Sequence, residues 1–355
     1  MCKARFLPSL HLLLFVSLVL ASCKDAGELL DLAKNPPKRE RIDAARMGLN
    51  NFFVDENFGS IEEQYREIRD ELGIKHIRIL LAWTDAVQPS PSAEANYSFF
   101  DKIIRSAPEG VDLLVVLAHC PSWMRDSSNW IGNNPRRTWI ERWLRPTVMR
   151  YRADSELSGP IVGWEVWNEP NLSRLTQDTV LGLDQVANYV ELLNYAHRDI
   201  RRLDPGRLIV LAASESINQR FPENLNYNKE LRRYGAEKLV DVWNIHYYST
   251  NFESLVASGG VADFLNDLPI PVWITESGER GPTNQLSYVE TAWPFLRKEA
   301  PGIDRIYYYE FSSSDALDEN YGLKNNSPDY PTSDLYNHLF EGRTLSKMGE
   351  FQTRR

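Results

Sequence analysis

Two short apolar segments that lie far apart in the sequence each end in a glutamate. Residues 161–167 are mostly branched or aromatic, as in a buried strand, and they lead into Asn168-Glu169-Pro170, where the proline ends strand pairing. Residues 271–274 lead in the same way into Thr275-Glu276-Ser277-Gly278. Two carboxylates that flank a glycosidic bond can hydrolyse it, one as an acid and the other as a base or nucleophile. The pair therefore predicts hydrolytic chemistry if the fold brings the two strand ends together.

Alternating strand and helix patterns predict a fold that would do this. Apolar strands are expected at residues 46–53, 76–83, 111–119, 161–167, 207–213, 240–248, 271–278 and 305–311. Helices are expected at residues 60–73, 99–106, 139–152, 183–202, 230–238, 255–266, 288–298 and 333–340. Eight such units favour an α/β fold of the (β/α)8 TIM barrel type, with catalytic groups at the carboxyl ends of the strands. An open doubly wound sheet is the alternative, although no glycine-rich nucleotide motif follows any strand.

The two glutamate motifs also carry a family resemblance. Asn168-Glu169-Pro170 with the later Thr275-Glu276 resembles clan A of the glycoside hydrolases, in which families 5 and 39 are most similar. The resemblance spans most of residues 46–340. It implies retaining hydrolysis of β-linked O-glycosidic bonds in oligo- or polysaccharides by double displacement, with Glu169 as general acid/base and Glu276 as nucleophile. It implies no cofactor and no metal.

Five further residues match positions of the clan that bind substrate. Arg78, on the second strand, matches an arginine that holds the nucleophile ionised, although a surface ion pair is the alternative reading. Asn168 matches the asparagine that bonds the sugar's 2-hydroxyl. His246 and Tyr248 form a His-x-Tyr pair that resembles family 5, where the tyrosine bonds the nucleophile and the histidine contacts the sugar. His119, at the end of the third strand, matches another histidine that contacts sugar.

The end of the eighth strand departs from the clan. In the clan, a tryptophan often forms the floor of the sugar site at this point. In this chain Tyr309 or Glu310 takes its place. The later Tyr321-Gly322-Leu323 resembles sequences near family 39, so the sugar preference stays open. In the loop after the third strand, Trp123 and Trp130 could stack on a sugar or could pack within the protein.

Composition limits the classes of partner. The chain has 355 residues, a formal net charge of −9 and a pI near 5.3, which argues against binding to nucleic acid, since that needs a basic face. Hydrophobic content of 43% with 25% charged residues fits a globular domain. We expect a monomer whose partner is a saccharide.

The first residues are typical of an export signal. Lys3 and Arg5 precede an apolar run at residues 10–20, which is too short to span a membrane. Leu20-Ala21-Ser22-Cys23 follows and resembles a bacterial lipobox, which implies cleavage before Cys23 and lipidation of that residue. We therefore expect an anchored lipoprotein of the bacterial cell envelope, at the outer membrane or facing the periplasm.

These assignments divide the chain into four parts. Residues 1–22 are the expected signal peptide, 23–41 a tether, 42–345 the catalytic domain and 346–355 a C-terminal tail. Processing would leave Cys120 as a lone thiol, so no disulfide framework is available and the core must hold the fold.

Two other functions compete with the glycosidase hypothesis. The first is a catalytically inactive carbohydrate-binding protein on the same barrel, which the presence of both glutamates together with Asn168 and Arg78 argues against. The second is a metal-dependent barrel hydrolase. It needs clustered histidine ligands, and no His-x-His follows the first strand.

Overall fold

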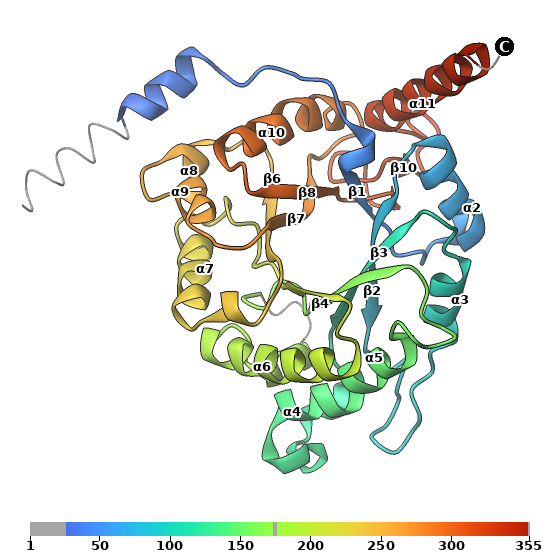
Figure 1. Ribbon diagram of the computed structural model, residues 1–355, viewed down its shortest axis with the longest axis vertical. Coiled ribbons are helices and arrows are strands. Elements are labelled where there is room, and N and C mark those ends of the chain that lie inside the picture. The colour runs from blue at the N-terminus through green and yellow to red at the C-terminus, as the bar shows by residue number, and fades with distance from the viewer. Residues whose placement is uncertain (1–25, 173–175, 354–355) are drawn as a thin grey trace, which may run out of the picture.

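Eight parallel strands form the centre of the computed structural model (Figure 1). The structure describes residues 26–172 and 176–353, with side chains described up to residue 343, so the expected signal peptide and Cys23 lie outside the described part. The strands are β1 Met47–Asn50, β2 His76–Ala82, β3 Asp112–Ala118, β4 Ile161–Val166, β5 Leu208–Leu211, β6 Trp243–Tyr248, β7 Val272–Gly278 and β8 Ile303–Tyr308.

The order of the strands makes this sheet a barrel. Hydrogen bonds link them in the order β5-β4-β3-β2-β1-β8-β7-β6, so the first strand in the chain pairs with both β2 and β8. The outermost strands, β5 and β6, meet through a parallel bridge between Val210 and Val242. The (β/α)8 TIM barrel is therefore confirmed, and the open doubly wound sheet is wrong, because in such a sheet the outermost strands do not meet.

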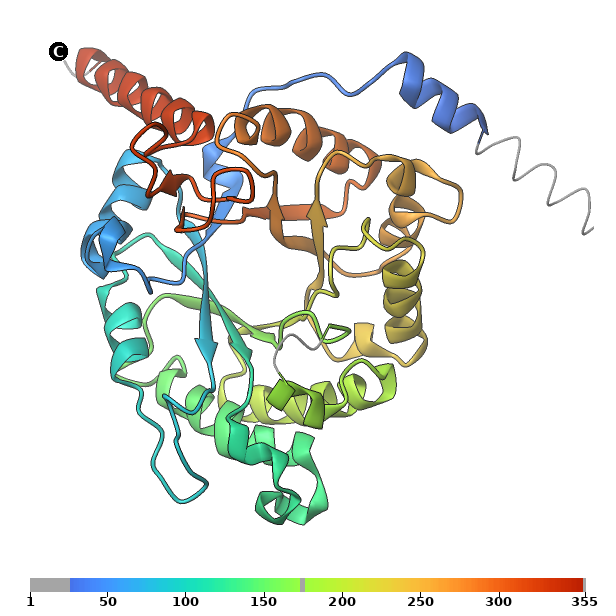
Figure 2. The same ribbon diagram turned by 180° about the vertical axis from the view of Figure 1, so that it is seen from behind.

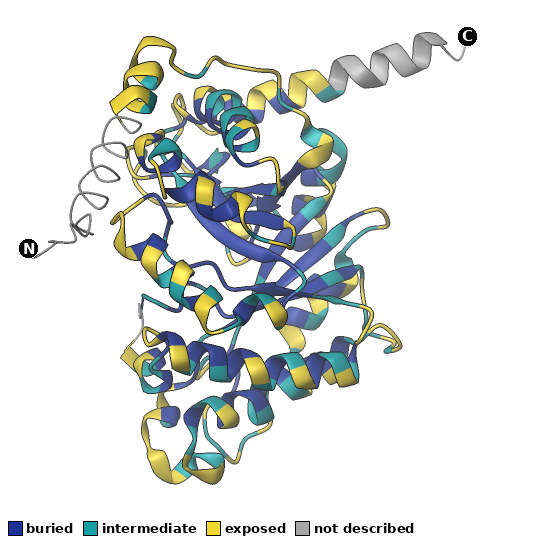
Figure 3. Cartoon of the chain, turned by 60° about the vertical axis from the view of Figure 1, so that its left-hand side comes forward, coloured by how far each residue is buried: buried dark blue, intermediate teal, exposed yellow. Residues whose placement is uncertain are grey.

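Helices surround the barrel on its outer side (Figures 1 and 2). They are α2 Ile61–Arg66, α3 Ser98–Ser106, α4 Pro135–Trp139, α5 Arg145–Tyr151, α6 Val186–Leu203, α7 Glu223–Arg233, α8 Glu253–Val256, α9 Val261–Asn266, α10 Gln285–Glu299 and α11 Asp334–Thr353. Two π-helical segments, Glu67–Glu71 and Ile140–Leu144, continue α2 and join α4 to α5. Burial follows this arrangement: the strands are buried and the outer helix faces are exposed (Figure 3).

Local capping explains where two of these helices begin. Ser60 is the N-cap of α2: it accepts a bond from the Glu63 amide, while the Glu63 side chain accepts one from the Ser60 amide. α4 begins at Pro135, four residues before the expected start. Asn134 caps the Arg137 amide, and proline at the first helical position needs no hydrogen-bond partner.

Both ends of the chain carry helix beyond the barrel units. Residues 26–34, within the expected tether, form a helix, and Leu32 packs against the barrel core. α11 continues to Thr353, through most of residues 346–355. None of the described helices combines the length and apolar character needed to cross a bilayer.

Side chains fill the interior of the barrel. Five of them form an apolar cluster: Leu114, Val210, Val242, Trp273 and Tyr307. Four other buried positions on the strands are polar and are bonded to one another: Asn50, Arg78, Glu165 and Asn244. The apolar cluster closes the barrel as a packed core, and the polar group supports the site described below.

Gly48 on β1 leaves room for the Tyr307 ring, and this contact can be tested. A Cβ at Gly48 would lie 2.3 Å from a Tyr307 ring carbon, so Gly48→Ala must displace the ring. We expect a loss of about 1–3 kcal/mol in the free energy of unfolding, measured by urea titration. Gly302→Ala is the control, because nothing lies within 4 Å of its added Cβ. Equal stability of the two variants would contradict the packing described here.

Candidate active site

Arg78 is the buried cation around which the site is built. Its side chain lies in the barrel, with the residue 1% exposed. Two of its nitrogens donate to the two oxygens of Glu165, each at 2.8 Å. A third contact, at 2.6 Å, joins it to Glu276, and further bonds at 2.8 Å reach the amide oxygens of Asn50 and Asn168. The alternative reading of Arg78 as a surface ion pair is therefore wrong.

Glu165 supplies the charge that makes a buried arginine tolerable. It is fully buried and accepts from Asn244 at 3.0 Å in addition to the two bonds from Arg78. Burial by itself lowers the pKa of Arg78, but the charges of Glu165 and Glu276 outweigh it and raise that pKa. Removing one partner of such a pair leaves an uncompensated buried charge, so the two residues depend on each other.

Glu276, on β7, receives donors on both oxygens. Arg78 bonds one oxygen, and the Tyr248 hydroxyl donates to the other at 2.9 Å. Burial and then the charge of Glu276 raise the pKa of Tyr248 well above its ordinary value, so the phenol keeps its proton and remains a donor. The two donors, one of them cationic, therefore hold the Glu276 carboxylate in a fixed orientation.

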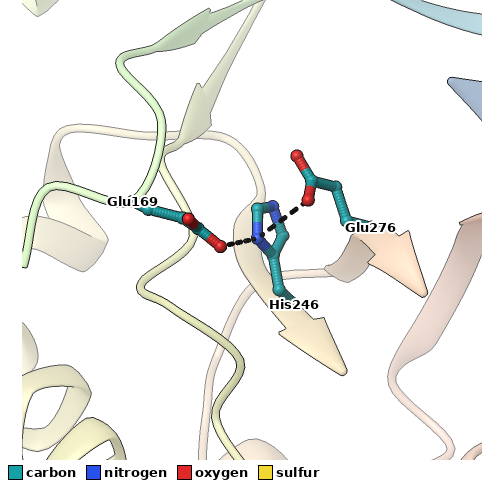
Figure 4. Close-up of side chains that lie close together, drawn as sticks. All are labelled: Glu169, His246 and Glu276. Carbon is teal, nitrogen blue, oxygen red and sulfur yellow. Dashed lines mark hydrogen bonds and ion pairs between the residues drawn. The ribbon is translucent and has the colours of Figure 1, made fainter. Parts of the chain in front are cut away.

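His246 lies between the two glutamates of the sequence motifs (Figure 4). Its Nδ1 is 3.0 Å from Glu169 and 3.5 Å from Glu276, while Nε2 is 3.3 Å from the Thr275 hydroxyl. One oxygen of each glutamate and one nitrogen of His246 all lie within 4.8 Å of one another. The barrel therefore brings the ends of β4 and β7 together, as the sequence predicted.

The backbone changes direction just before Glu169. Strand β4 ends at Val166, and both Trp167 and Glu169 adopt positive φ angles, 80° and 45°. Such angles are uncommon for residues with a Cβ and are found preferentially at functional sites. Beyond the strand, Trp167 packs with its ring centroid 5.6 Å from that of Trp139, while Glu169 faces the site.

A cavity of about 570 Å³ opens over these residues. Seven of the sequence-predicted residues line it: Arg78, His119, Asn168, Glu169, Tyr248, Tyr309 and Glu276. Tyr309 and Tyr321 make edge contacts with Tyr248 and with each other, at centroid distances of 5.4 to 6.2 Å. The cavity therefore combines carboxylates, hydrogen-bond donors and an aromatic wall, which is the composition expected of a saccharide site.

Comparison with known families now decides the class of protein. The family model described as "Cellulase (glycosyl hydrolase family 5)" matches residues 42–308, most of the chain. This chain belongs to glycosyl hydrolase family 5. It is therefore a member of clan A of the glycoside hydrolases. A search of curated proteins found no match.

Solved structures share the fold at low sequence identity. A family 39 glycoside hydrolase from Bacteroides cellulosilyticus is 18% identical, with a TM-score of 0.58, over 85% of this chain and 64% of that one. A family 39 β-xylosidase from Caulobacter crescentus is 18% identical, with a TM-score of 0.59, over 86% and 72%. A family 5 enzyme from Streptomyces cattleya, bound to Manβ1-4GlcNAc, is 16% identical, with a TM-score of 0.55, over 84% and 80%.

Three residues predicted to bind substrate do not line this cavity of the family 5 barrel. Trp123 is not among the residues that line the cavity; its indole donates to the Gln88 carbonyl and its ring packs on Trp83. His246 is fully buried and contacts the two carboxylates. Glu310 lines a smaller adjoining cavity of about 240 Å³.

Several cavity residues carry no signal in the sequence. They come from the loops that follow β5, β7 and β8: Glu215, Ser216, Gln219, Arg280, Asp315 and Glu319. Loop residues such as these lie outside periodic segments and belong to no motif. Only the resemblance of Tyr321-Gly322-Leu323 to family 39 pointed to this region.

Tyr248 provides the first test of the site. Tyr248→Phe removes the donor to Glu276 and should lower kcat/KM about tenfold to a hundredfold, because a bond to a charged group contributes about 1.5–3 kcal/mol. Tyr247→Phe is the matched control, since the Tyr247 hydroxyl bonds the Asn251 carbonyl, away from the cavity. Steady-state kinetics on a cleaved glycoside measures both. Equal losses in the two variants would contradict the assigned contact.

Glu310 predicts a dependence of stability on pH. Burial, followed by the charges of Glu276 and Asp315, raises the pKa of the Glu310 carboxyl from 4.5 to about 8. The folded state therefore binds this proton more tightly than the unfolded chain does. The protonated Glu310 carboxyl contributes its full stability below about pH 4.5, and this contribution is lost as pH rises through about 8.

Glu310→Gln should remove that loss, because glutamine mimics the protonated acid at every pH. Urea midpoints of parent and variant, measured from acid to mildly alkaline pH, should diverge in favour of the variant as pH rises. Parallel curves would contradict the assignment.

Proposed function

We propose that this chain is a retaining glycosidase that cleaves β-linked O-glycosidic bonds of oligo- or polysaccharides by double displacement. Glu276 is the nucleophile and Glu169 the general acid/base. One observation carries the proposal: Glu169 and Glu276 both contact His246 at close range, and Glu276 is also bonded to the guanidinium of Arg78.

The spacing of the carboxylates supports a retaining mechanism. Retaining enzymes hold them about 5–5.5 Å apart, whereas inverting enzymes leave about 6.5–9.5 Å for a water molecule. Oxygens of Glu169 and Glu276 lie within 4.8 Å of each other, which fits direct attack by a carboxylate better than attack by an interposed water.

The first half of the reaction forms a glycosyl-enzyme. An oxygen of Glu276 attacks the anomeric carbon as the bond to the leaving oxygen breaks, and Glu169 gives its proton to that oxygen. Arg78 and Tyr248 hold the attacking carboxylate in place. Glu169 is then ionised beside His246.

The second half restores the enzyme. Glu169 takes a proton from water, and the resulting hydroxide attacks the anomeric carbon from the side that the leaving group vacated. Glu276 departs as a carboxylate, and two inversions leave the anomeric configuration unchanged.

Asn168 is oriented to assist both steps. Its amide oxygen accepts from Arg78, which fixes the orientation of the amide and leaves the NH₂ group as a donor at the cavity. A donor there can bond a sugar oxygen next to the reacting carbon, as the clan's asparagine does with the 2-hydroxyl. Asn168 thus links substrate binding to the same guanidinium that holds Glu276.

The β-linkage rests on structural relatives. Solved structures with this fold include a β-xylosidase, a β-galactosidase and an endo-1,4-β-mannanase, each described as acting on β-linked sugars. At such low identity the likeness establishes the fold and not which sugar is bound. A panel of aryl β-glycosides and β-linked polysaccharides is therefore the first screen.

Azide rescue separates the roles of the two glutamates. In Glu169→Ala, an aryl β-glycoside should still form the glycosyl-enzyme, because its phenol needs little protonation. Azide should then release a β-glycosyl azide. In Glu276→Ala, azide can take the place of the missing nucleophile and should yield the α-azide. Proton NMR distinguishes the two anomers.

The same experiment has clear failure modes. Exchanged anomers would reverse the two roles, and full activity of either variant would remove that glutamate from the mechanism. The parent enzyme treated with a chelator is the control, since Glu169, His246 and Glu276 are near enough to hold a metal ion. Loss of activity on chelation would favour the metal-dependent hydrolase instead.

The envelope location is a further part of the proposal. The lipobox-like Leu20-Ala21-Ser22-Cys23 supports an anchor at Cys23, which would keep the enzyme at a bacterial membrane. Cys23→Ser should abolish incorporation of labelled palmitate and release the protein from membranes or leave it unprocessed. Equal membrane association of parent and variant would contradict the anchor.

A further inference from the structure

His119 reaches the catalytic cavity with one of its ring nitrogens already occupied. Its Nδ1 lies 2.7 Å from an oxygen of Asp178, a residue that is 6% exposed. The imidazole borders the cavity, and its side chain is 24% exposed. Nε2 is therefore the ring nitrogen left for a ligand.

Asp178 is itself held by the chain that follows β3. Its other oxygen accepts from the Cys120 backbone amide at 3.0 Å and lies 3.5 Å from the Cys120 sulfur. The carbonyl of His119 accepts from the Trp139 indole at 2.8 Å, which fixes the backbone beside the imidazole. Each oxygen of the Asp178 carboxylate thus has a separate nitrogen to accept from.

We propose that Asp178 is a positioning residue that keeps the proton of neutral His119 on Nδ1, so that Nε2 accepts a hydrogen bond from a hydroxyl group of the sugar. A carboxylate can only accept, so the imidazole nitrogen that faces it must carry the proton. The opposite nitrogen then presents a lone pair to the cavity. The site thereby selects a sugar with a hydroxyl that can donate at this position. The substrate part of this inference rests on the proposed glycosidase function.

Asp178→Asn gives a sharp test because its geometry forces a change of tautomer. The Cys120 amide can only donate, so the asparagine oxygen must stay with it. The asparagine NH₂ then faces Nδ1 of His119, and two donors cannot face each other. The imidazole proton must move to Nε2, which becomes a donor toward the cavity.

The tautomer is measured on the free protein, without any substrate. ¹⁵N NMR of the imidazoles at about pH 8.5, where an ordinary histidine is neutral, reports which nitrogen carries the proton. His119→Gln assigns the signal. We expect Nδ1–H in the parent and Nε2–H in Asp178→Asn. The same tautomer in both proteins would overturn the proposal, whether or not the protein is a glycosidase.

Steady-state kinetics tests whether a hydroxyl of the sugar donates a hydrogen bond to Nε2 of His119. With a para-nitrophenyl β-glycoside that the parent cleaves, Asp178→Asn should raise KM about tenfold and leave kcat nearly unchanged, because the contact forms before the reaction. Asp178→Ala, which leaves both tautomers accessible, should also raise KM.

Cys120→Ala is the matched control, because it disturbs Asp178 without touching His119. It should retain the parent's tautomer and KM. A tautomer change in Asp178→Asn with an unchanged KM would overturn the contact between Nε2 and the sugar. A raised KM in Cys120→Ala would mean that the loss comes from disturbed packing around Asp178, and this would overturn its role as a positioning residue.

Discussion

The guanidinium of Arg78 is the constraint on which the site depends. It is buried inside the barrel, and it reaches the strand that carries Glu165 and the strand that carries Glu276. A buried cation must be paired, and Arg78 is paired with two carboxylates, Glu165 and Glu276. The network therefore fixes the distance between β4 and β7 and, with it, the distance between the two carboxylates.

The two glutamates that meet in the site have different neighbours. Glu276 lies against a guanidinium and a phenol that keeps its proton, whereas Glu169 lies against His246 at a point where the backbone leaves its strand. His246 is fully buried and contacts both carboxylates from its place between them. One fold thus gives two identical side chains different surroundings, and the separate tasks proposed for them rest on that difference.

The sequence predicted those features that depend on strand periodicity or on a motif. The barrel and the meeting of Glu169 with Glu276 followed from strand periodicity and the two glutamate motifs. The bonds of Arg78 and Tyr248 to Glu276 followed from the resemblance to the clan. The sequence left the place of Trp123 open, because this residue lies in a loop without periodicity. The complete burial of His246 was not predicted, because period two gives the face of a strand and not the depth of a side chain. Asp178 and the acidic loop residues could not be predicted, since they come from connections without periodicity.

Trapping the covalent intermediate tests most directly whether Arg78 and Tyr248 hold a nucleophile. A 2-deoxy-2-fluoro β-glycoside with a good leaving group slows the second half of the reaction, so that a glycosyl ester accumulates. Mass spectrometry of the digested protein should then find one added glycosyl group on the peptide that contains Glu276. A label on Glu169, or no label from a fluoroglycoside whose parent sugar is cleaved, would contradict the account.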